Sequence, residues 1–405
     1  MFAIRKHTLA PLIPFLFFTC GTLASSLMLE AGAYSSEIAQ AGYYTGGWYR
    51  YVIYMVLSIL EYFVIFRMLS PRLQFERVMV NERLIIILFA VSLLFYSAPV
   101  FYYGPAVLIE LNRYEFMDLP HVKFFNIKLY IAVMAFYLGL TAGPGGSYRA
   151  MAKTLFFALI IVMLMYGEKV SGPITAFISY YGGLLMASQD NKIKLAGLLK
   201  IGLGIAGFFL LIYYLWGAMA GHTADIIFDA FLDRASRQGQ VWWKLDELAN
   251  YQGGAMGKSV LDNLNNYAYA SNNPLGNQYI KSLLMPAELY QMHSGSLAAV
   301  YPGILYLNND FYTFLAYALV MNAIYWIVQI AIYFYSFRSF AIYALPATCA
   351  WYAVHLKIFQ SGNIYLISHI NYLAGLTFFL IILLLFQYMR RTGRKLPATS
   401  THKVC

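Results

Sequence analysis

Long uninterrupted apolar runs constrain the fold of this chain more than any other feature of its sequence. Runs of this kind cover Tyr51–Leu69, Leu84–Tyr103 and Phe311–Tyr335. A helix needs roughly 20 apolar residues to cross the hydrocarbon core of a bilayer, and these runs have about that length. They are continuous rather than alternating with polar residues, which argues against a membrane β-barrel. The sequence therefore predicts an all-α, polytopic integral membrane bundle.

The composition agrees with this class. Only 11% of the residues are charged and 60% are hydrophobic, whereas a soluble domain has about 25% charged residues. The formal net charge of +10 could suggest a nucleic-acid partner, but most Lys and Arg lie in short connectors between apolar runs. Connectors of this kind are cytoplasmic under the positive-inside rule. We therefore expect membrane lipids, and no nucleic acid, around this chain.

About ten spans are predicted, within a range of 10–12. They are Thr8–Leu29, Tyr51–Leu69, Leu84–Tyr103, Phe125–Leu140, Thr154–Tyr166, Pro173–Ala187, Leu195–Ala220, Phe311–Tyr335, Phe340–Val354 and Tyr365–Met389. The first run, which follows Arg5 and Lys6, could also be a cleaved signal peptide. We favour an uncleaved span, because the run is long and another follows soon after.

Charges in the connectors predict the orientation. Arg67, Arg72, Arg77 and Arg83 mark a cytoplasmic connector, as do Arg149 with Lys153 and Lys192 with Lys194. His222–Asp310 is the one long segment too polar for hydrocarbon, and it holds five Lys or Arg against eight Asp or Glu. The predicted division is an N-terminal bundle (1–221), a large extracytoplasmic loop with short helices (222–310), C-terminal spans (311–389) and a tail (390–405). Both termini are expected in the cytoplasm.

Several chemistries have no support in the sequence. Cys20, Cys349 and Cys405 lack metal-ligand spacing, and no metal or other cofactor is expected. A phosphate-binding P-loop, a zinc-protease HExxH and a GxSxG nucleophile motif are all missing. These observations disfavour ATP-driven transport within this chain, zinc proteolysis and serine hydrolysis.

The start of the loop carries the first candidate site. Asp225–Gln238 has the periodicity of an amphipathic helix, with Thr223 at the N-cap position. Arg234 and Arg237 lie one turn apart near the expected bilayer surface, where two guanidinium groups could hold a pyrophosphate. The alternative is a solvated face with a simple ion pair between Asp233 and Arg237.

Aromatic residues follow this helix directly. Trp242 and Trp243 are either interfacial anchors or platforms on which a sugar ring packs. The later run LDNLNNYAYASNNPLGNQY is rich in neutral hydrogen-bonding groups, which suit a hydroxyl-rich ligand or a plain polar loop equally well.

Other ionisable residues are weaker candidates. His293 could act as a general base for a hydroxyl, although a lone loop histidine is more often not catalytic. Arg113 and Lys357 could add positive charge to a phosphate site at the outer face, where His355 and His369 are also expected. Glu61 lies inside the second span, where a carboxylate is costly; it is either functional or paired with a cation on another span.

The segment FLDRASRQGQVWW (231–243), together with the size, the Tyr and Phe richness and the single dominant loop, resembles the bacterial O-antigen (oligosaccharide repeat-unit) polymerases called Wzy. The resemblance covers the whole chain as architecture. The spaced Arg-to-Gly loop repeats of some members are not found here.

The resemblance implies a glycosyltransferase of the inner membrane that polymerises undecaprenyl-pyrophosphate-linked oligosaccharide repeat units at the periplasmic face without a metal. In that reaction Arg234 and Arg237 would hold the leaving pyrophosphate, and His293 or Asp233 would deprotonate the acceptor hydroxyl. A chain-length regulator protein would be a partner.

Three other functions fit the same sequence. A transporter or flippase of lipid-linked saccharides would use a polar cavity in the middle of the membrane. A membrane O-acyltransferase acting on glycans would use a histidine beside a span, such as His355 or His369. A structural subunit would bind a partner through the loop.

Overall fold

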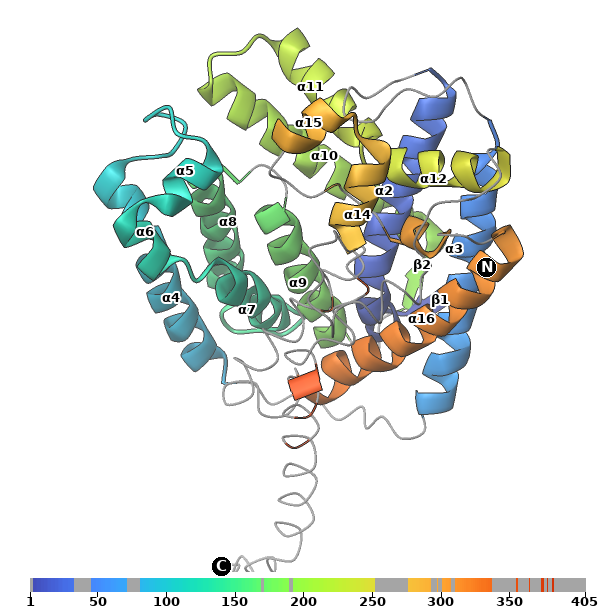
Figure 1. Ribbon diagram of the computed structural model, residues 1–405. Helices are drawn as coiled ribbons and strands as arrows, with labels where there is room; N and C mark the ends of the chain where they lie inside the picture. The colour runs from blue at the N-terminus through green and yellow to red at the C-terminus, as the bar shows by residue number, and fades with distance from the viewer. Residues whose placement is uncertain are drawn as a thin grey trace, which may run out of the picture.

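The computed structural model of this protein is a bundle of helices with one small pair of strands (Figure 1). It describes residues 3–32, 45–70, 81–168, 171–188, 192–251, 276–292, 297, 301–306 and 310–336, and the single positions 355, 364, 373, 374, 377 and 381. The statements that follow concern these residues.

Within the described ranges, five helical segments are long and apolar enough to cross a membrane. These are Lys6–Glu30, Gly47–Leu69, Glu82–Tyr103, Pro120–Thr141 and Phe311–Phe334. They coincide with predicted spans one to four and eight, and they are compatible with a helical membrane protein. The predicted spans near Phe340–Val354 and Tyr365–Met389 lie outside the described residues, apart from single positions.

The helices of the bundle are the following elements. They are α1 (Lys6–Leu9), the 3-10 turn η1 (Ala10–Leu12), α2 (Ile13–Glu30), α3 (Gly47–Leu69), α4 (Glu82–Tyr103), α6 (Pro120–Phe125), α7 (Lys128–Thr141), α8 (Arg149–Met165), α9 (Ser171–Ala187), α10 (Leu195–Met219), α16 (Phe311–Ala331) and the π turn η4 (Ile332–Ser336). Predicted spans five, six and seven correspond to α8, α9 and α10. In Figure 1, α4, α7 and α8 lie on one side of α9, and α2, α3 and α16 lie on the other.

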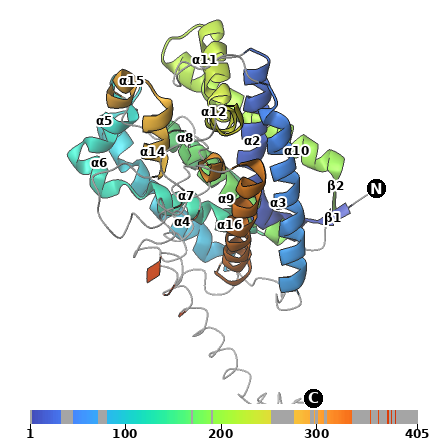
Figure 2. The ribbon, with the colours of Figure 1, turned by 45° about the vertical axis from the view of Figure 1, so that its right-hand side comes forward.

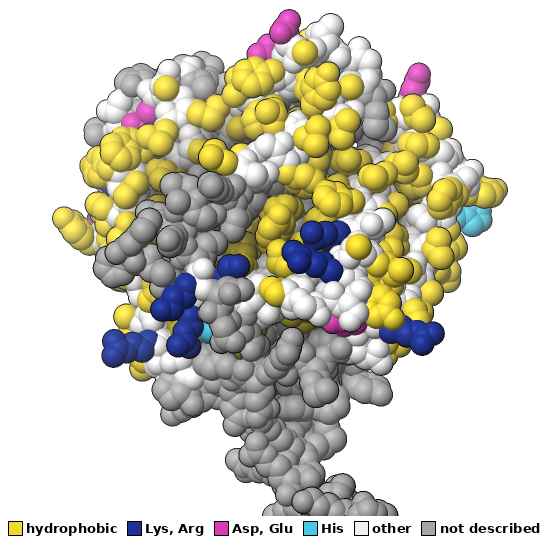
Figure 3. Space-filling model, turned by 180° about the vertical axis from the view of Figure 1, so that it is seen from behind, with side chains coloured by type: hydrophobic (Ala, Val, Ile, Leu, Met, Phe, Trp, Pro, Cys, Tyr) yellow, Lys and Arg dark blue, Asp and Glu magenta, His cyan; other side chains and the backbone are white. Residues whose placement is uncertain are grey.

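The outer faces of these helices are apolar. Val64 on α3, Leu94 on α4 and Val320 on α16 are 59%, 67% and 62% exposed, whereas Ser58 and Asn322 on the inner faces are fully buried. Apolar side chains facing outward suit hydrocarbon and not water. Figure 3 shows Lys and Arg side chains gathered in the lower part of one face, with most acidic side chains at the top.

Connectors that the sequence assigns to the same side of the membrane lie together. The strand β1 (Ala3–Arg5) pairs in antiparallel register with β2 (Lys192–Lys194), and Ile4 lies opposite Ile193. The carboxylate of Glu82 accepts hydrogen bonds from the backbone N–H groups of Ser147 and Tyr148. Each of these contacts joins two connectors that were both predicted to be cytoplasmic.

Among the described helices, α7 and α9 pack most closely, because glycines allow their backbones to meet. A Cβ on Gly139 would lie 1.9 Å from the carbonyl oxygen of Tyr180, and one on Gly183 would lie 1.9 Å from that of Phe136. Gly139 and Gly143 are spaced as in a GxxxG motif. This pair forms the middle of the bundle.

The described parts of the segment predicted as a long loop pack on the bundle. They contain α11 (Ala224–Ser236), α12 (Gln240–Tyr251), α14 (Gly276–Leu284), α15 (Ala287–Met292) and η3 (Gly303–Tyr306). In Figures 1 and 2, α11 and α12 lie at the upper ends of α2 and α3. Val241, Leu245 and Ile304 are fully buried in the same apolar cluster as the membrane helices. The predicted segment 222–310 therefore shares its core with the spans.

Candidate functional site

The predicted amphipathic helix near the start of the loop is confirmed as α11. Thr223 holds its N-cap position, but its side chain makes no capping hydrogen bond. The helix turns back along α10: a Cβ on Gly217 would lie 2.3 Å from Ile227, and the rings of Tyr213 and Phe231 are 5.6 Å apart. Its arginines therefore lie beside the last turns of α10.

The two arginines of α11 have different surroundings. Arg237 forms an ion pair with Asp233, as the i,i+4 spacing allows. Arg234 is half-buried, and in the described part of the chain its guanidinium forms no ion pair or hydrogen bond. Arg234 is therefore the guanidinium on this helix whose donors are available to an anion.

A corner between α11 and α12 fastens this helix to the end of α2. The Ser25 hydroxyl donates to the carbonyl of Ser236 and accepts from the backbone N–H of Gly239, with a 2.6 Å distance for the second bond. The Thr22 hydroxyl donates to the carbonyl of Gln238 at 3.4 Å. A Cβ on Gly239 would lie 2.5 Å from the carbonyl oxygen of Thr22, so only glycine fits this approach. Arg237 is thereby held near the last two turns of α2.

The tandem tryptophans begin α12 and face inward. Trp242 is fully buried; its indole N–H donates to the carbonyl of Gly47 at 3.0 Å, and its ring lies 5.0 Å from that of Tyr51. Trp243 is 6% exposed and packs against Leu29. In this arrangement neither ring offers a face to a sugar. The two side chains instead anchor α12 on α2 and α3.

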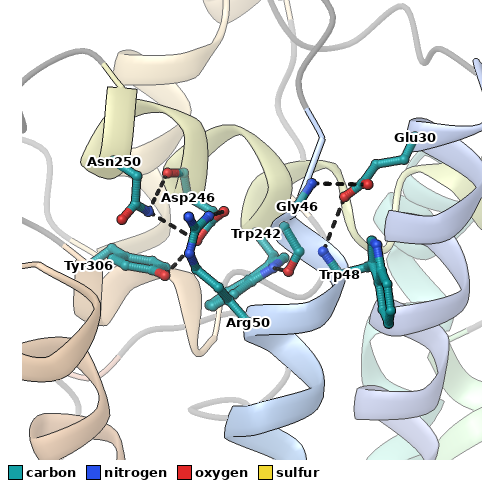
Figure 4. Close-up of polar contacts among 9 residues, drawn as sticks. Glu30, Gly46, Trp48, Arg50, Trp242, Asp246, Asn250 and Tyr306 are labelled. Carbon is teal, nitrogen blue, oxygen red and sulfur yellow. Dashed lines mark hydrogen bonds and ion pairs between the residues drawn. The ribbon is translucent and has the colours of Figure 1, made fainter.

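A polar cluster that the sequence analysis did not identify lies next to Trp242 (Figure 4). We call Arg50, Asp246, Asn250 and Tyr306 the rim cluster. Asp246 is fully buried; it accepts from Arg50 at 2.9 Å and from the Tyr306 hydroxyl at 2.5 Å. Burial and the charge of Asp246 raise the pKa of Tyr306 well above its usual value. This cluster joins α12, α3 and η3 by hydrogen bonds around a fully buried carboxylate.

A second polar contact near the rim cluster joins the end of α2 to the start of α3. The carboxylate of Glu30 accepts hydrogen bonds from the backbone N–H groups of Gly46 and Trp48, both at 3.1 Å (Figure 4). Glu30 thus holds the start of α3 against the end of α2. Polar side-chain contacts as well as apolar packing therefore hold α2 and α3 together where α12 packs on them.

Arg113 has its own partners. It lies in α5 (Arg113–Asp118), and its guanidinium contacts the fully buried carboxylate of Glu168 at 3.1 Å, which also accepts from Lys128. It also donates to the Tyr114 hydroxyl at 2.8 Å. Two cations on one carboxylate leave this triad with a net charge of +1. The triad joins the connector after α4 to the turn between α8 and α9.

The remaining predicted site residues fall largely outside the described residues. His293, Lys357 and His369 lie there. His355 is described: it is fully buried and stacks on Tyr325, with 4.4 Å between the ring centroids. Tyr325 lies in the second half of α16. The expectation that His355 lies at the outer face is therefore wrong; the ring is held inside the bundle.

No group of three or more His, Cys, Asp or Glu side chains that could hold a metal ion occurs among the described residues. The rim cluster was missed because Arg50 and Asp246 are separated by 196 positions, and sequence periodicity carries no information on such a pair. The position of Arg50 at the start of a span was the only signal that could have suggested a buried partner.

Fold and site together define a class: a helical bundle with segments long and apolar enough to cross a membrane, on which the polar helices α11 and α12 pack, with Arg234 and Arg237 beside them. Comparisons with protein-family models, curated proteins and solved structures found no match. The function of this chain is therefore argued from its own residues.

Proposed function

We propose that this chain polymerises lipid-linked oligosaccharide repeat units at the periplasmic face of the inner membrane. The donor would be a growing glycan on undecaprenyl pyrophosphate, and the acceptor a hydroxyl of the terminal sugar of a second lipid-linked unit. The oxygen of that hydroxyl attacks the anomeric carbon of the donor. The bond between this carbon and the pyrophosphate oxygen breaks, and the hydroxyl proton passes to a base.

The depth of the arginines carries this proposal. A lipid pyrophosphate stays at the headgroup level, because its hydrocarbon chain is held in the bilayer. The Ser25 hydroxyl, which donates to the Ser236 carbonyl and accepts from the Gly239 N–H, holds α11 near the last turns of α2. In this proposal these turns lie at the level of the lipid pyrophosphate. Arg234 has donors available there. Because α11 packs back against the bundle, its arginines are better placed to bind a lipid-bound anion than they would be on a helix exposed to solvent.

In this proposal Arg234 and Arg237 stabilise the negative charge that develops on the departing pyrophosphate. Asp233 orients Arg237 through their ion pair. The base is His293 or Asp233. The leaving lipid pyrophosphate drives the reaction, so no nucleotide is consumed. A chain-length regulator would be the expected protein partner, and the loop and the pyrophosphate site would face the periplasm.

The proposal is tested in a strain that lacks this gene. We expect loss of long polymer with retention of single repeat units on the surface. Arg234→Ala and Arg237→Ala should each lower polymer by at least tenfold while the protein stays inserted in the membrane. Arg149→Ala, at the opposite predicted side, is the control and should complement fully. Full-length polymer from both α11 variants would refute the proposed site.

One observation favours the flippase alternative. Asn322 in α16 is fully buried among polar groups, accepting from Tyr301 at 2.6 Å and donating to Ser58 at 2.7 Å. A polar network inside membrane helices is a feature of transport paths. A flippase predicts complete loss of surface-exposed repeat units in the deletion strain, so the same experiment separates the two functions.

A further inference from the structure

The face of α16 below Asn322 carries polar groups that the bundle does not use. Gln329 and Trp326 are both fully buried. Within the described residues, the oxygen and nitrogen of the Gln329 side-chain amide have no hydrogen-bond partner, and the Trp326 indole nitrogen has none either. Asn322, Trp326 and Gln329 follow one another at intervals of four and three residues, so they share one face of the helix.

These groups lie in an apolar setting where they are costly. The Trp326 ring lies 4.9 Å from Tyr62 on α3 and 4.9 Å from Phe15 on α2. In hydrocarbon no bulk water can replace a missing partner, so polar groups in membrane helices usually serve a function. Leucine at position 329 would fill similar space without this cost. The chain nevertheless has an amide there.

The backbone around these side chains is also irregular. The first membrane helix is interrupted by the 3-10 turn η1, which contains Pro11, and η1 packs on α9 and α16. Directly after α16 the chain forms the π turn η4. Irregular turns inside membrane helices occur where the backbone is buried in protein or lines a cavity, and π turns are frequent at functional sites. Two such turns therefore border the buried polar face.

The contact between η4 and α9 brings the Tyr333 hydroxyl close to Gly182. A Cβ on Gly182 would lie 2.8 Å from the Tyr333 hydroxyl oxygen, so glycine is what allows this phenol to reach α9. Tyr333 is four residues beyond Gln329, on the same side of the helix. The polar face thus continues from Asn322 to the end of the helix.

We propose that Gln329 and Trp326 form an internal site that binds the hydroxyl oxygen of a neutral ligand. The amide offers one acceptor and two donors and the indole offers one donor. An oxygen that both accepts and donates satisfies this set, whereas the neutral groups give no charge to bind an ion. Two sources carry this chemistry: water entering from one membrane face, and a hydroxyl of a lipid-linked saccharide.

Cysteine accessibility tests this site in native membranes. In a background with Cys20, Cys349 and Cys405 replaced by serine, Gln329→Cys is labelled with methanethiosulfonate ethylsulfonate, a charged reagent that needs an aqueous path. Ile330→Cys, also fully buried and next along the chain, controls for the void that a smaller side chain leaves. We expect labelling at 329 to be at least tenfold faster than at 330. Equal rates would overturn the proposal.

A second variant keeps the test independent of labelling. If the amide had no ligand, Gln329→Leu would remove an unsatisfied group and raise the melting temperature by several degrees, which would also count against the site. We expect an unchanged or lower melting temperature. Added lipid-linked saccharide distinguishes the two sources: slower labelling at 329 identifies the saccharide, and an unchanged rate identifies water. The outcome does not depend on polymerase activity.

Discussion

Asp246 shows how one buried carboxylate can join three segments. It is fully buried and contacts Arg50, whose side chain is 14% exposed, and the hydroxyl of Tyr306. Removing one member of a buried ion pair leaves the other charge without compensation, which typically costs 3–5 kcal/mol. The slight exposure of Arg50 should reduce this cost, because water can solvate part of the guanidinium.

We therefore expect Asp246→Asn to lower the free energy of unfolding by about 2–4 kcal/mol, measured as a shift in thermal unfolding of the detergent-purified protein. Asp118→Asn is the matched control: its pair with Lys123 is exposed, with side chains 76% and 64% accessible, and such pairs contribute about 0–1 kcal/mol. Similar shifts for the two variants would show that the rim cluster is not a stabilising contact.

Gly239 allows the corner between α11 and α12 to approach the backbone of α2 closely. We expect Gly239→Ala to destabilise the protein by about 1–3 kcal/mol, because the new Cβ would collide with the Thr22 carbonyl. Loss of polymer should follow, since the corner that holds α11 moves. Gly207→Ala on α10, with open space around it, should change neither property. A tolerated alanine at 239 would contradict the close approach of α2 and α12.

At the scale of elements, the pairing of α7 with α9 depends on small residues. Gly139 and Gly183 let carbonyl oxygens of the opposite helix approach their Cα atoms. Side chains at these positions would separate the helices along their whole contact.

Gly139→Leu should therefore destabilise the bundle by at least about 3 kcal/mol, at the upper end of overpacking costs, and reduce the amount of folded protein in the membrane. Gly202→Leu, on the open side of α10, supplies the control with the same added volume. Fluorescence-detected gel filtration of the two variants measures the effect. Equal recovery of both proteins would rule out the glycine contact.

For the whole molecule, the pairing of β1 with β2 relates the N-terminus to a connector almost two hundred residues away. Directly opposite residues in antiparallel strands have Cα atoms about 4.5–5.5 Å apart, which suits a disulfide. Both segments were predicted to be cytoplasmic, so a bond between them reports on fold and on sidedness together.

In a cysteine-free background, Ile4→Cys with Ile193→Cys should form a disulfide on mild oxidation in membranes. A protease site placed in the connector 71–80 would then yield fragments that stay joined until reductant is added. Ile4→Cys paired with Val320→Cys, which faces outward from α16, should not cross-link. Separation of the fragments of the first pair without reductant would show that the two strands do not meet.

The sequence by itself determined the helical class of this protein and the approximate limits of the five described segments that are long and apolar enough to cross a membrane. Hydropathy is a local property: each run of about twenty apolar residues favours a membrane helix regardless of its neighbours. The amphipathic period of α11 and the ion pair between Asp233 and Arg237 are local in the same sense, because both follow from helical spacing.

The tertiary structure decided which residues meet across the chain. The burial of Trp242, the partnership of Arg50 with Asp246, and the position of His355 inside the bundle all depend on helices that are far apart in sequence. Composition and periodicity do not predict contacts between residues that are far apart in the sequence. For this reason the sequence predicted a polar segment between the apolar runs, and only the fold showed that α11 and α12 of this segment pack on α2 and α3.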